Sequence, residues 1–384
     1  MKRSPRPILQ RGFTLVELLV AVTIGMALTL AMTLMLTRHE AGRRSLTNLN
    51  DSTMSGVYAS YVLDRSLRGA GSGFAQAWRT GIGCRLLVSR GPTQVLPRTS
   101  DFPAPFASAP RTQYLAPVVV HAGVGPGGSD VLAVATGNSG LSEAPLRVLP
   151  LSAAADNLRV PATVGLREKD LVLVMDGNAQ CMMQQVVDGF TGGATQTLTF
   201  GGTYAASNIA GVDLTGMGSS VTAWVTPVGN VEGNQPAFQL FGVDANANLV
   251  SLDMLKLDGN DAVLPIAEGV ADMRALYGVD TNDDGRIDEW RSPATAPFDA
   301  ATLQGGTADA KLSLGRILAI RVGLVMRGST PERDAVSPAT ITLFDDLATG
   351  LQQTRTLSSA EQKYRWRTIE FTVPLRNVML SPRN

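Results

Sequence analysis

The sequence predicts an α+β fold in which one long N-terminal helix precedes a large β-rich head. The first observation is an apolar stretch of 24 residues, 13–36, long enough for a helix of about 36 Å. The second is an amphipathic pattern that continues the helix to residue 67. The third is a change beyond Gly73 to short β-type runs separated by Gly, Pro, Asn and Asp.

The apolar stretch reads as a membrane span. Four basic residues precede it, and Glu17 is its one charged residue. A secretory signal peptide would have a shorter apolar core and a small-residue cleavage site after it. The positive-inside rule places the first dozen residues in the cytoplasm and the body outside. A plain single-pass anchor would explain length and orientation but not an acid inside the span, which costs about 3 kcal/mol.

The boundary of the span reads Gly-Phe-Thr-Leu-Val-Glu, from Gly12 to Glu17. This hexapeptide resembles the type III signal of type IV prepilins and type II secretion pseudopilins. In that family a membrane peptidase cuts after the glycine and methylates the new N-terminal residue. The resemblance implies cleavage of the Gly12–Phe13 bond, N-methylation of Phe13 and an assembly role for Glu17.

A charge argument gives Glu17 a role. Cleavage would leave a positive amine on Phe13, and the helix would pack among related helices in a dry bundle. A carboxylate on one subunit can neutralise its neighbour's amine, whereas a wrong register leaves both buried and unpaired, at about 3–5 kcal/mol. We therefore expect Glu17 to set the register of assembly. The alternative is a tolerated acid that reaches the lipid headgroups.

The pilin resemblance suggests four segments: a leader, 1–12; a transmembrane half of the helix, 13–36; an amphipathic half, 37–70; and a head, 71–384. The run of glycines after Arg68 should end the helix. One apolar face of the second half is predicted to pack against the head. Its members recur at spacings near three and four: Leu46, Leu49, Val57, Tyr61 and Leu67.

The head is predicted to be β-rich, with insertions or two subdomains, because it exceeds the size of a minimal pilin head. Residues 89–115 are rich in Pro, Ser and Thr and read as a long loop. The candidate strands are Val118–His121, Val131–Thr136, Leu171–Met175, Met182–Val187, Thr195–Phe200, Val221–Val225, Phe238–Val243, Ile317–Met326 and Thr368–Val373.

Composition argues against nucleic acid as the main partner, because 33 basic and 33 acidic residues give zero net charge. A basic and aromatic segment of the kind that stacks on nucleic-acid bases is formed by Arg365, Trp366 and Arg367. With so little basic excess around it, the segment is better explained as exposed positions of a strand. The two cysteines, Cys84 and Cys181, follow the span and so would face an oxidising periplasm. They form either one disulfide or two buried thiols.

The segment Asp280-Thr-Asn-Asp-Asp-Gly fits a calcium-loop pattern, with oxygen-bearing side chains at alternate positions and a turn at Gly285. Position twelve is Arg291, where an EF-hand has its bidentate Glu, so no EF-hand is predicted. We expect a calcium loop closed by Asp288 or Glu289; an ordinary acidic turn is the alternative. The candidate ligands are Asp280, Asn282, Asp284, the carbonyl of Arg286, and Asp288.

No pattern indicates an enzyme. The run from Gly123 to Gly128 fits G-x-G-x-x-G, but Pro126 interrupts it and a strand pattern follows where a nucleotide site needs a helix. His39 and His121 belong to no catalytic motif. We expect both histidines to be solvated or interfacial.

Several body segments resemble the PilW-like minor pilins of type IV pili: Arg68-Gly-Ala-Gly, Ser129-Asp-Val-Leu, Tyr277-Gly-Val-Asp-Thr-Asn-Asp-Asp-Gly, Ile317 to Arg327, and Phe371-Thr-Val-Pro-Leu-Arg-Asn. The resemblance implies a pilin-like fold and a subunit that primes assembly at or near the tip. Its partners would be other minor pilins, the major pilin, the prepilin peptidase, the inner-membrane assembly platform and a large tip adhesin. A type II secretion pseudopilin and an anchored DNA-uptake or adhesion protein remain alternatives.

Overall fold

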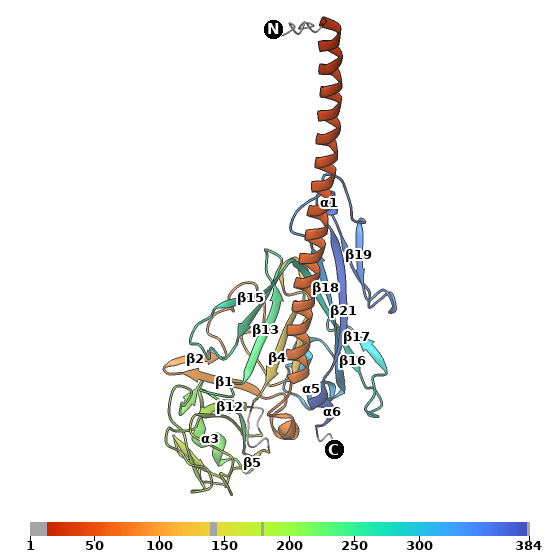
Figure 1. Ribbon diagram of the computed structural model, residues 1–384. Coiled ribbons are helices and arrows are strands. Elements are labelled where there is room, and N and C mark those ends of the chain that lie inside the picture. The colour runs from red at the N-terminus through yellow and green to blue at the C-terminus, as the bar shows by residue number, and fades with distance from the viewer. Residues whose placement is uncertain (1–13, 139–143, 178–179, 382–384) are drawn as a thin grey trace, which may run out of the picture. The chain divides into compact units, whose positions relative to one another are not determined.

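The computed structural model describes residues 14–138, 144–177 and 180–381, without the side chains of residues 37–49 (Figure 1). The chain divides into two compact units, Met1–Asp51 and Ser52–Asn384. Helix α1, Leu15–Gly69, contributes to both units. The long N-terminal helix and the β-rich remainder confirm the predicted α+β class.

Helix α1 ends where the glycine run begins, as predicted. Gly71 and Gly73 have φ of 82° and 78°, in the left-handed region that side chains disfavour. Short helices follow in the head: η1 (Ala75–Ala77), α2 (Trp78–Gly81), η2 (Pro126–Gly128), α3 (Leu214–Ser219), α4 (Ala300–Leu303), α5 (Ala308–Arg316), η3 (Glu361–Lys363) and α6 (Arg376–Met379).

A six-stranded sheet has the order β2-β1-β8-β7-β12-β5. Its strands are β2 (Thr93–Leu96), β1 (Arg85–Arg90), β8 (Gln180–Gln185), β7 (Asp170–Met175), β12 (Trp224–Asn230) and β5 (Leu146–Arg147). Strands β1 and β8 are parallel, and the other neighbours in this sheet are antiparallel. This sheet therefore joins segments that lie far apart in the sequence.

Two further sheets are antiparallel throughout. The five-stranded sheet contains β15 (Val263–Glu268), β14 (Asn248–Asp253), β13 (Ala237–Val243), β4 (Val131–Thr136) and β3 (Val118–His121), in that order. The four-stranded sheet contains β17 (Glu289–Arg291), β16 (Val270–Val279), β18 (Ile317–Arg327) and β21 (Trp366–Pro374). Two-stranded pairs are β10 (Asn208–Ile209) with β11 (Val212–Asp213), β6 (Asn157–Arg159) with β9 (Thr197–Thr199), and β19 (Thr340–Leu343) with β20 (Gln353–Thr356).

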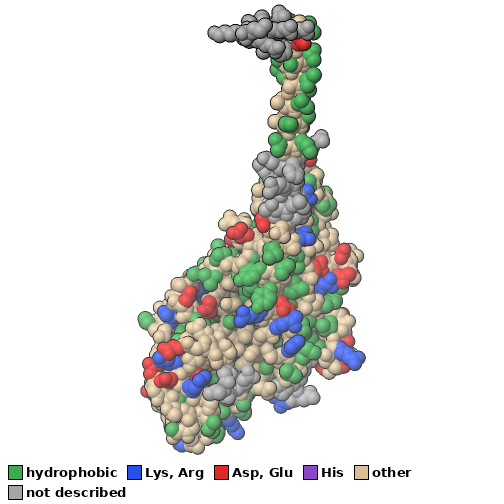
Figure 2. All heavy atoms as spheres, viewed as in Figure 1, with side chains coloured by type: hydrophobic (Ala, Val, Ile, Leu, Met, Phe, Trp, Pro, Cys, Tyr) green, Lys and Arg blue, Asp and Glu red, His purple; other side chains and the backbone are tan. Residues whose placement is uncertain are grey.

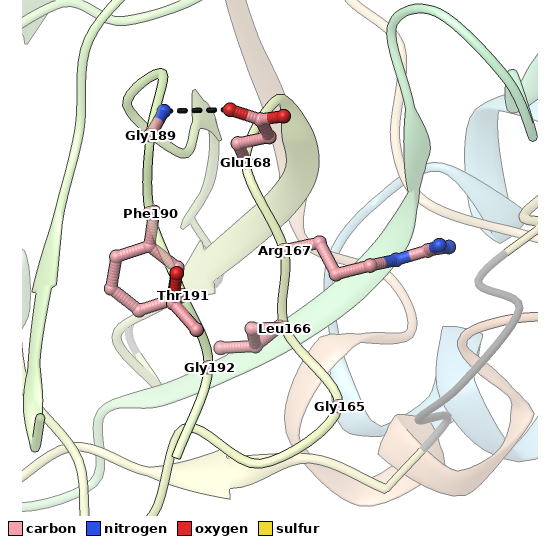
Figure 3. Close-up of a pocket in the computed structure, with 8 residues that line it drawn as sticks. All are labelled: Gly165, Leu166, Arg167, Glu168, Gly189, Phe190, Thr191 and Gly192. Carbon is pink, nitrogen blue, oxygen red and sulfur yellow. Dashed lines mark hydrogen bonds between the residues drawn. The ribbon is translucent and has the colours of Figure 1, made fainter. Parts of the chain in front are cut away.

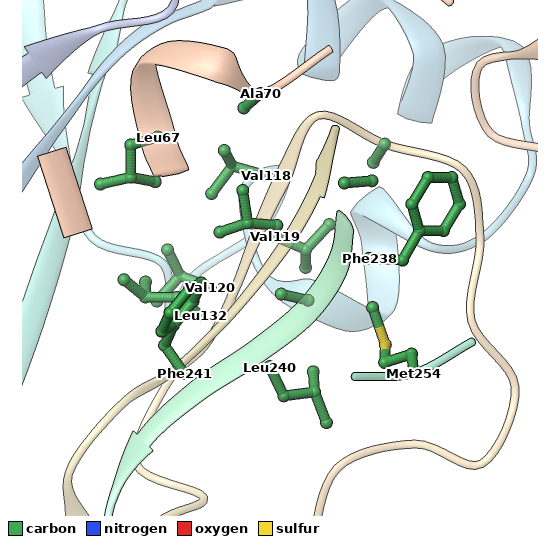
Figure 4. Close-up of a cluster of buried hydrophobic side chains, with 14 of the residues drawn as sticks. Leu67, Ala70, Val118, Val119, Val120, Leu132, Phe238, Leu240, Phe241 and Met254 are labelled. Carbon is green, nitrogen blue, oxygen red and sulfur yellow. The ribbon is translucent and has the colours of Figure 1, made fainter. Parts of the chain in front are cut away.

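The main core lies where the last turns of α1 meet the five-stranded sheet. Figure 4 shows Leu67 and Ala70 near Val118 and Val119 of β3, in the same cluster as Phe238 and Phe241 of β13. A second apolar cluster packs on the six-stranded sheet and includes Leu87, Val172 and Met182. A third, smaller cluster includes Leu343 and Phe344 of the β19 segment and packs with β16 and β18. The separate clusters give the head several local cores.

The strand predictions hold best for fully buried runs. Val118–His121 and Val131–Thr136 match β3 and β4 at both ends, whereas the other predicted strands shift by one or more residues. The predicted loop 89–115 is wrong in its first part, which contains the end of β1 and all of β2. The hairpin forms there because Val95 and Leu96 are fully buried.

The predicted packing face of α1 is partly wrong. Leu67 is buried, but Val57 and Tyr61 are 56% and 58% exposed. The residues that face the head instead are Ala59 and Leu63, both buried.

Candidate functional site

The start of α1 carries the predicted assembly residues. Gly12 and Phe13, the residues of the predicted cleavage site, lie outside the described residues. Thr14 is the first described residue, and α1 begins at Leu15. Glu17 lies in the first turn of the helix. An acid in this turn is favoured by the partial positive charge of a helix N-terminus.

Thr14 and Glu17 bind each other reciprocally. The Thr14 N–H and hydroxyl both donate to Glu17 Oε2 at 3.1 Å, and the Glu17 N–H donates to Thr14 Oγ1 at 3.3 Å. This is a capping box, which satisfies main-chain N–H groups that lack partners within the helix. Thr14 is not among the site residues predicted from the sequence, although its spacing of three residues from Glu17 is the known signal for such a box.

Residues Leu15–Leu36 are long and apolar enough to cross a membrane, with a mean hydropathy of 2.2 and no part buried within the protein. The hydroxyls of Thr23, Thr29 and Thr33 donate to main-chain carbonyls one turn back. The hydroxyls of these three threonines therefore need no outside acceptor. The surface of this helix segment suits lipid or another apolar helix.

The predicted disulfide between Cys84 and Cys181 is present, with a Cα–Cα distance of 5.6 Å. Both cysteines are buried, at 1% and 0% exposure. Cys84 immediately precedes β1, and Cys181 pairs with Leu86 across the parallel β1–β8 contact. The bond therefore covalently ties two neighbouring strands that are separated by 97 residues.

The acidic loop connects β16 to β17 and begins at Asp280, which is fully buried. Asp280 Oδ2 accepts from the Gly285 N–H at 2.8 Å, and Oδ1 accepts from the Asp284 N–H at 3.2 Å. Asn282 Oδ1 accepts from the same Asp284 N–H at 3.0 Å. Gly285 has a φ of 84°, so it supplies the sharp turn that the pattern predicts.

Asp288 closes the loop onto its beginning. Its Oδ2 accepts from the Thr281 N–H at 2.8 Å and from the Thr281 hydroxyl at 2.7 Å, and these bonds lower the pKa of Asp288. Glu289 instead pairs with Arg291 at 2.7 Å. The exposed Arg286 donates its N–H to Asp284 Oδ1 at 2.9 Å.

The side-chain oxygens of Asp280, Asn282 and Asp284 thus accept hydrogen bonds from main-chain N–H groups of the same loop. Within the described residues, no three or more His, Cys, Asp or Glu side chains converge as a metal-ligand group. The carboxylates of this loop accept hydrogen bonds from N–H donors. To bind a cation, several of these carboxylates would have to rotate away from their donors.

The glycine-rich segment is a loop before a strand. It contains η2 and is followed by β4. Asp130 Oδ1 accepts from the Gly123 N–H at 2.9 Å, and Oδ2 accepts from the Ala275 N–H of β16 at 2.9 Å. Asp130 therefore fastens the loop to the four-stranded sheet.

The two histidines contribute little to a site. The side chain of His39 lies outside the described part of the chain. His121 ends β3 and is 2% exposed, so the solvated position expected for it is wrong. Burial lowers the pKa of His121 to about 4, which favours the neutral ring at neutral pH.

The basic segment near the C-terminus is engaged within the head. Arg365 Nε lies 3.1 Å from Glu332 Oε1. Trp366 Nε1 donates to the Glu361 carbonyl at 2.8 Å, and Arg367 donates to the Thr53 hydroxyl of α1. These bonds make the segment part of the fold, because each of the three side chains has a partner there.

A surface hollow of about 490 Å³ lies between residues 165–168 and 189–192. Figure 3 shows Phe190 and Leu166 facing one another, with Arg167 extending away from them. Glu168 accepts from the Gly189 N–H at 2.7 Å. Among the residues that line this hollow, the one carboxylate is thus already bonded, and no pair for acid–base chemistry is present.

Comparison with known families defines the class of protein first. Residues 9–33 match the family described as the prokaryotic N-terminal methylation motif. This match covers the hexapeptide, Thr14 and Glu17, and most of the apolar span. The chain is therefore a type IV pilin-like protein with a prepilin signal.

Within that class the chain is PilW-like. Residues 241–377 match the family described as type IV pilus-assembly protein W. The matched region runs from the end of β13 through the acidic loop and the four-stranded sheet. Both matched families consist of structural assembly proteins. No curated protein and no solved structure matches the chain.

Proposed function

We propose that the chain is a minor pilin that prepilin peptidase processes and that primes assembly of a type IV pilus at or near its tip. The observation that carries the proposal is the union in one chain of a methylation motif, residues 9–33, and a PilW-like region, residues 241–377. The second unit, Ser52–Asn384, is large for a repeating shaft subunit. Its size favours a specialised position.

The proposed mechanism begins with cleavage of the Gly12–Phe13 bond and methylation of Phe13. The new amine would lie one residue before Thr14, at the helix end where Glu17 is held. On leaving the bilayer, α1 would enter a bundle in which the Glu17 carboxylate neutralises a neighbour's amine. Glu17 would then exchange its bonds with Thr14 for that charged partner, which gives a stronger hydrogen bond.

The proposed cellular location follows from the methylation motif and the apolar span at the start of the chain. Before assembly the chain would be a single-pass inner-membrane protein with its head in the periplasm, and afterwards it would be part of a surface fibre. The proposed partners are other minor pilins, the major pilin, prepilin peptidase, the inner-membrane assembly platform and a large tip adhesin. The methylation motif and the apolar span support this placement.

The test is a deletion strain scored for surface pili and twitching motility, with and without retraction. The proposal expects few or no pili, with partial recovery when retraction is blocked. Normal pili with loss of exoprotein release would support a type II secretion pseudopilin instead. Normal pili with loss of DNA binding or uptake would support a receptor.

The role of Glu17 is tested with two variants in the full chain. Glu17→Ala removes both the charge and the capping acceptor, whereas Glu17→Gln keeps an acceptor that suits a capping box. Both should be cleaved normally, and neither should enter fibres. Fibres that contain the Gln variant at parental levels would contradict a charge-neutralising role.

We also propose that the loop 280–288 binds calcium weakly. The support is the alternate placement of Asp280, Asn282 and Asp284 and the turn at Gly285. Calorimetry of residues 52–384 should detect binding at millimolar calcium, and Asp284→Asn should weaken it. No heat of binding in the parent protein would remove this proposal.

A further inference from the structure

Two surface hollows adjoin at the end of the six-stranded sheet where β7 begins and β12 ends. The first is the hollow of about 490 Å³ between residues 165–168 and 189–192, and the second, of about 400 Å³, lies between residues 167–169 and 230–234. Arg167 and Glu168 line both hollows, so we call the pair the double hollow. Each volume lies within the range of about 300–1,000 Å³ that is usual for small-molecule sites.

Hydrogen bonds fix the shape of the first hollow. The Thr163 hydroxyl donates to the Thr195 carbonyl at 2.5 Å and accepts from the Gly193 N–H at 2.9 Å. Glu168 accepts from the Gly189 N–H at 2.7 Å, which ties one wall of the hollow to the other. A surface that is already ordered loses little conformational entropy when a ligand binds.

The first hollow has an apolar floor. Leu166 is 1% exposed, and the partly buried Phe190 packs against the second apolar cluster. The two side chains face one another, and Arg167 extends away from them and lines the second hollow (Figure 3). The face of an aromatic ring carries partial negative charge, so Phe190 suits a ligand that presents weakly positive C–H groups.

Polar groups with unused hydrogen-bonding capacity surround this floor. Within the described residues, the guanidinium of Arg167, the hydroxyl of Thr191 and the side-chain amide of Asn234 have no hydrogen-bond partner. Glu168 uses only Oε2 for the Gly189 N–H. The double hollow therefore offers donors, acceptors and a hydroxyl that can act as either.

The charges of the double hollow cancel. It is lined by two basic residues, Arg167 and Lys169, and two acidic residues, Glu168 and Glu232. Lys169 Nζ lies 2.5 Å from Glu232 Oε1. Figure 2 shows the same mixture of Lys and Arg among Asp and Glu on the visible face of the head. A phosphate or sulfate ester would meet a carboxylate near each cation, so a neutral ligand is favoured.

We propose that the double hollow binds a neutral carbohydrate chain of at least two pyranose rings. One ring stacks its C–H face on Phe190 and bonds through its hydroxyls to Thr191 and Glu168. The next ring lies in the second hollow and bonds to Arg167 and Asn234. Sugar hydroxyls both donate and accept, which suits this mixed set of groups, whereas a purely apolar ligand would leave them without partners.

The first experiment is saturation-transfer NMR on the full-length chain in lauryldimethylamine oxide, a detergent without a sugar headgroup. The neutral probes are lactose, maltotriose, cellotriose, mannotriose and chitotriose, and sialyllactose is the charged counterpart of lactose. The proposal expects saturable binding of at least one neutral probe, with the strongest transfer to C–H protons on one face of a ring. Binding of no neutral probe, or tighter binding of sialyllactose than of every neutral probe, would overturn it.

The same panel distinguishes two sources of such a chain. Tighter binding of chitotriose than of the hexose probes would support an N-acetylated chain, such as the glycan backbone of peptidoglycan. Tighter binding of a hexose probe would support a surface polysaccharide.

Variants of Phe190 test the stacking contact. Phe190→Leu keeps an apolar side chain but removes the ring, so the Kd should rise about tenfold. Phe190→Trp keeps a stacking surface and should retain binding. Tyr58→Ala removes a ring of α1 that is 54% exposed and is the matched control. Parental binding by Phe190→Leu, or equal loss in the Tyr58 control, would overturn the contact.

The polar contacts are tested without changing the apolar cluster. Thr191→Val combined with Asn234→Ala removes two side-chain groups that have no hydrogen-bond partner within the described part of the head. The thermal midpoint should therefore stay parental, while the Kd should rise about tenfold, because two hydrogen bonds to the sugar are lost. Parental binding by this double variant would overturn the proposed site, whether or not Phe190→Leu folds.

This inference is independent of the proposed function. The double hollow lies outside both regions that match known families, residues 9–33 and 241–377. Loss of pili in the deletion strain without sugar binding by the protein would overturn the carbohydrate site and leave the proposed function standing. Sugar binding by a chain whose deletion leaves pili and motility unchanged would do the reverse.

Discussion

Thr14 and Glu17 form a reciprocal pair at the start of α1: the Thr14 N–H and hydroxyl donate to the Glu17 carboxylate, and the Glu17 N–H donates to the Thr14 hydroxyl. The acid that the sequence marks for assembly is therefore already bonded within its own subunit. The intersubunit pairing proposed for Glu17 would have to compete with these bonds.

The first prediction concerns this capping pair. Thr14→Ala should destabilise the first turn of α1 by about 1 kcal/mol, because the N-cap side chain is lost. Amide hydrogen exchange at residue 17, measured in detergent micelles, should accelerate about fivefold. Thr14→Ser keeps the hydroxyl and should exchange at the parental rate. Equal exchange in all three proteins would show that the pair contributes nothing.

The strands that could be predicted from the sequence are those whose side chains are buried on both faces of the sheet. Strands β3 and β4 were found because Val118–Val120 and Val131–Val134 are buried on both faces and read as continuous apolar runs. Strand β16 was missed because buried Asp272 and partly buried Arg274 interrupt its pattern. That pattern makes sense only once the Arg274–Asp272 ion pair is known.

The packing face of α1 shows a different limit. Periodicity correctly found apolar positions at Val57 and Tyr61 but could not tell which of two apolar faces meets the head. Ala59 carries little hydrophobic signal, yet it is fully buried. The two cysteines show a further limit. An oxidising compartment made a Cys84–Cys181 disulfide one of two alternatives, and only the close approach of the two residues in the fold decides for the bond.

The second prediction concerns the disulfide. Replacing both Cys84 and Cys181 by Ser should cost about 4 kcal/mol of unfolding free energy, because the bond closes a loop of 97 residues. Denaturant unfolding of residues 52–384 measures this cost. Dithiothreitol without denaturant should have little effect on the parent, since both sulfurs are buried. Equal midpoints for parent and double variant would contradict the prediction.

The third prediction concerns two buried groups with opposite pH responses. Burial raises the pKa of Asp130 from 3.8 to about 6, so its contribution to stability is lost as pH rises from about 4 through 6. Burial lowers the pKa of His121 from 6.5 to about 4, so its contribution is gained as pH rises through the same window. Each shift corresponds to roughly 3 kcal/mol, so the two effects nearly cancel.

Single variants should expose the cancellation. His121→Leu leaves Asp130 to act alone, so unfolding free energy should fall between pH 4 and 6.5 relative to the parent. Asp130→Asn leaves His121, so stability relative to the parent should rise over the same window. Urea titrations at several pH values compare the slopes, which matter more than the absolute stabilities. Parallel curves for both variants and the parent would refute the assignment.

The last prediction concerns Gly56, where α1 lies against the four-stranded sheet. A Cβ atom at this position would overlap the Ile369 side chain of β21 and lie 3.3 Å from Met326 Cγ of β18. Gly56→Leu should therefore destabilise the head by about 1–3 kcal/mol through overpacking. Gly56→Ala should be nearly neutral, because the end of Ile369 can rotate away and alanine favours the helix by about 1 kcal/mol. Tyr58→Leu, on the exposed side of the same helix, is the control and should change the unfolding free energy little. If Gly56→Leu unfolds at the parental urea concentration, α1 does not need this close approach to the sheet.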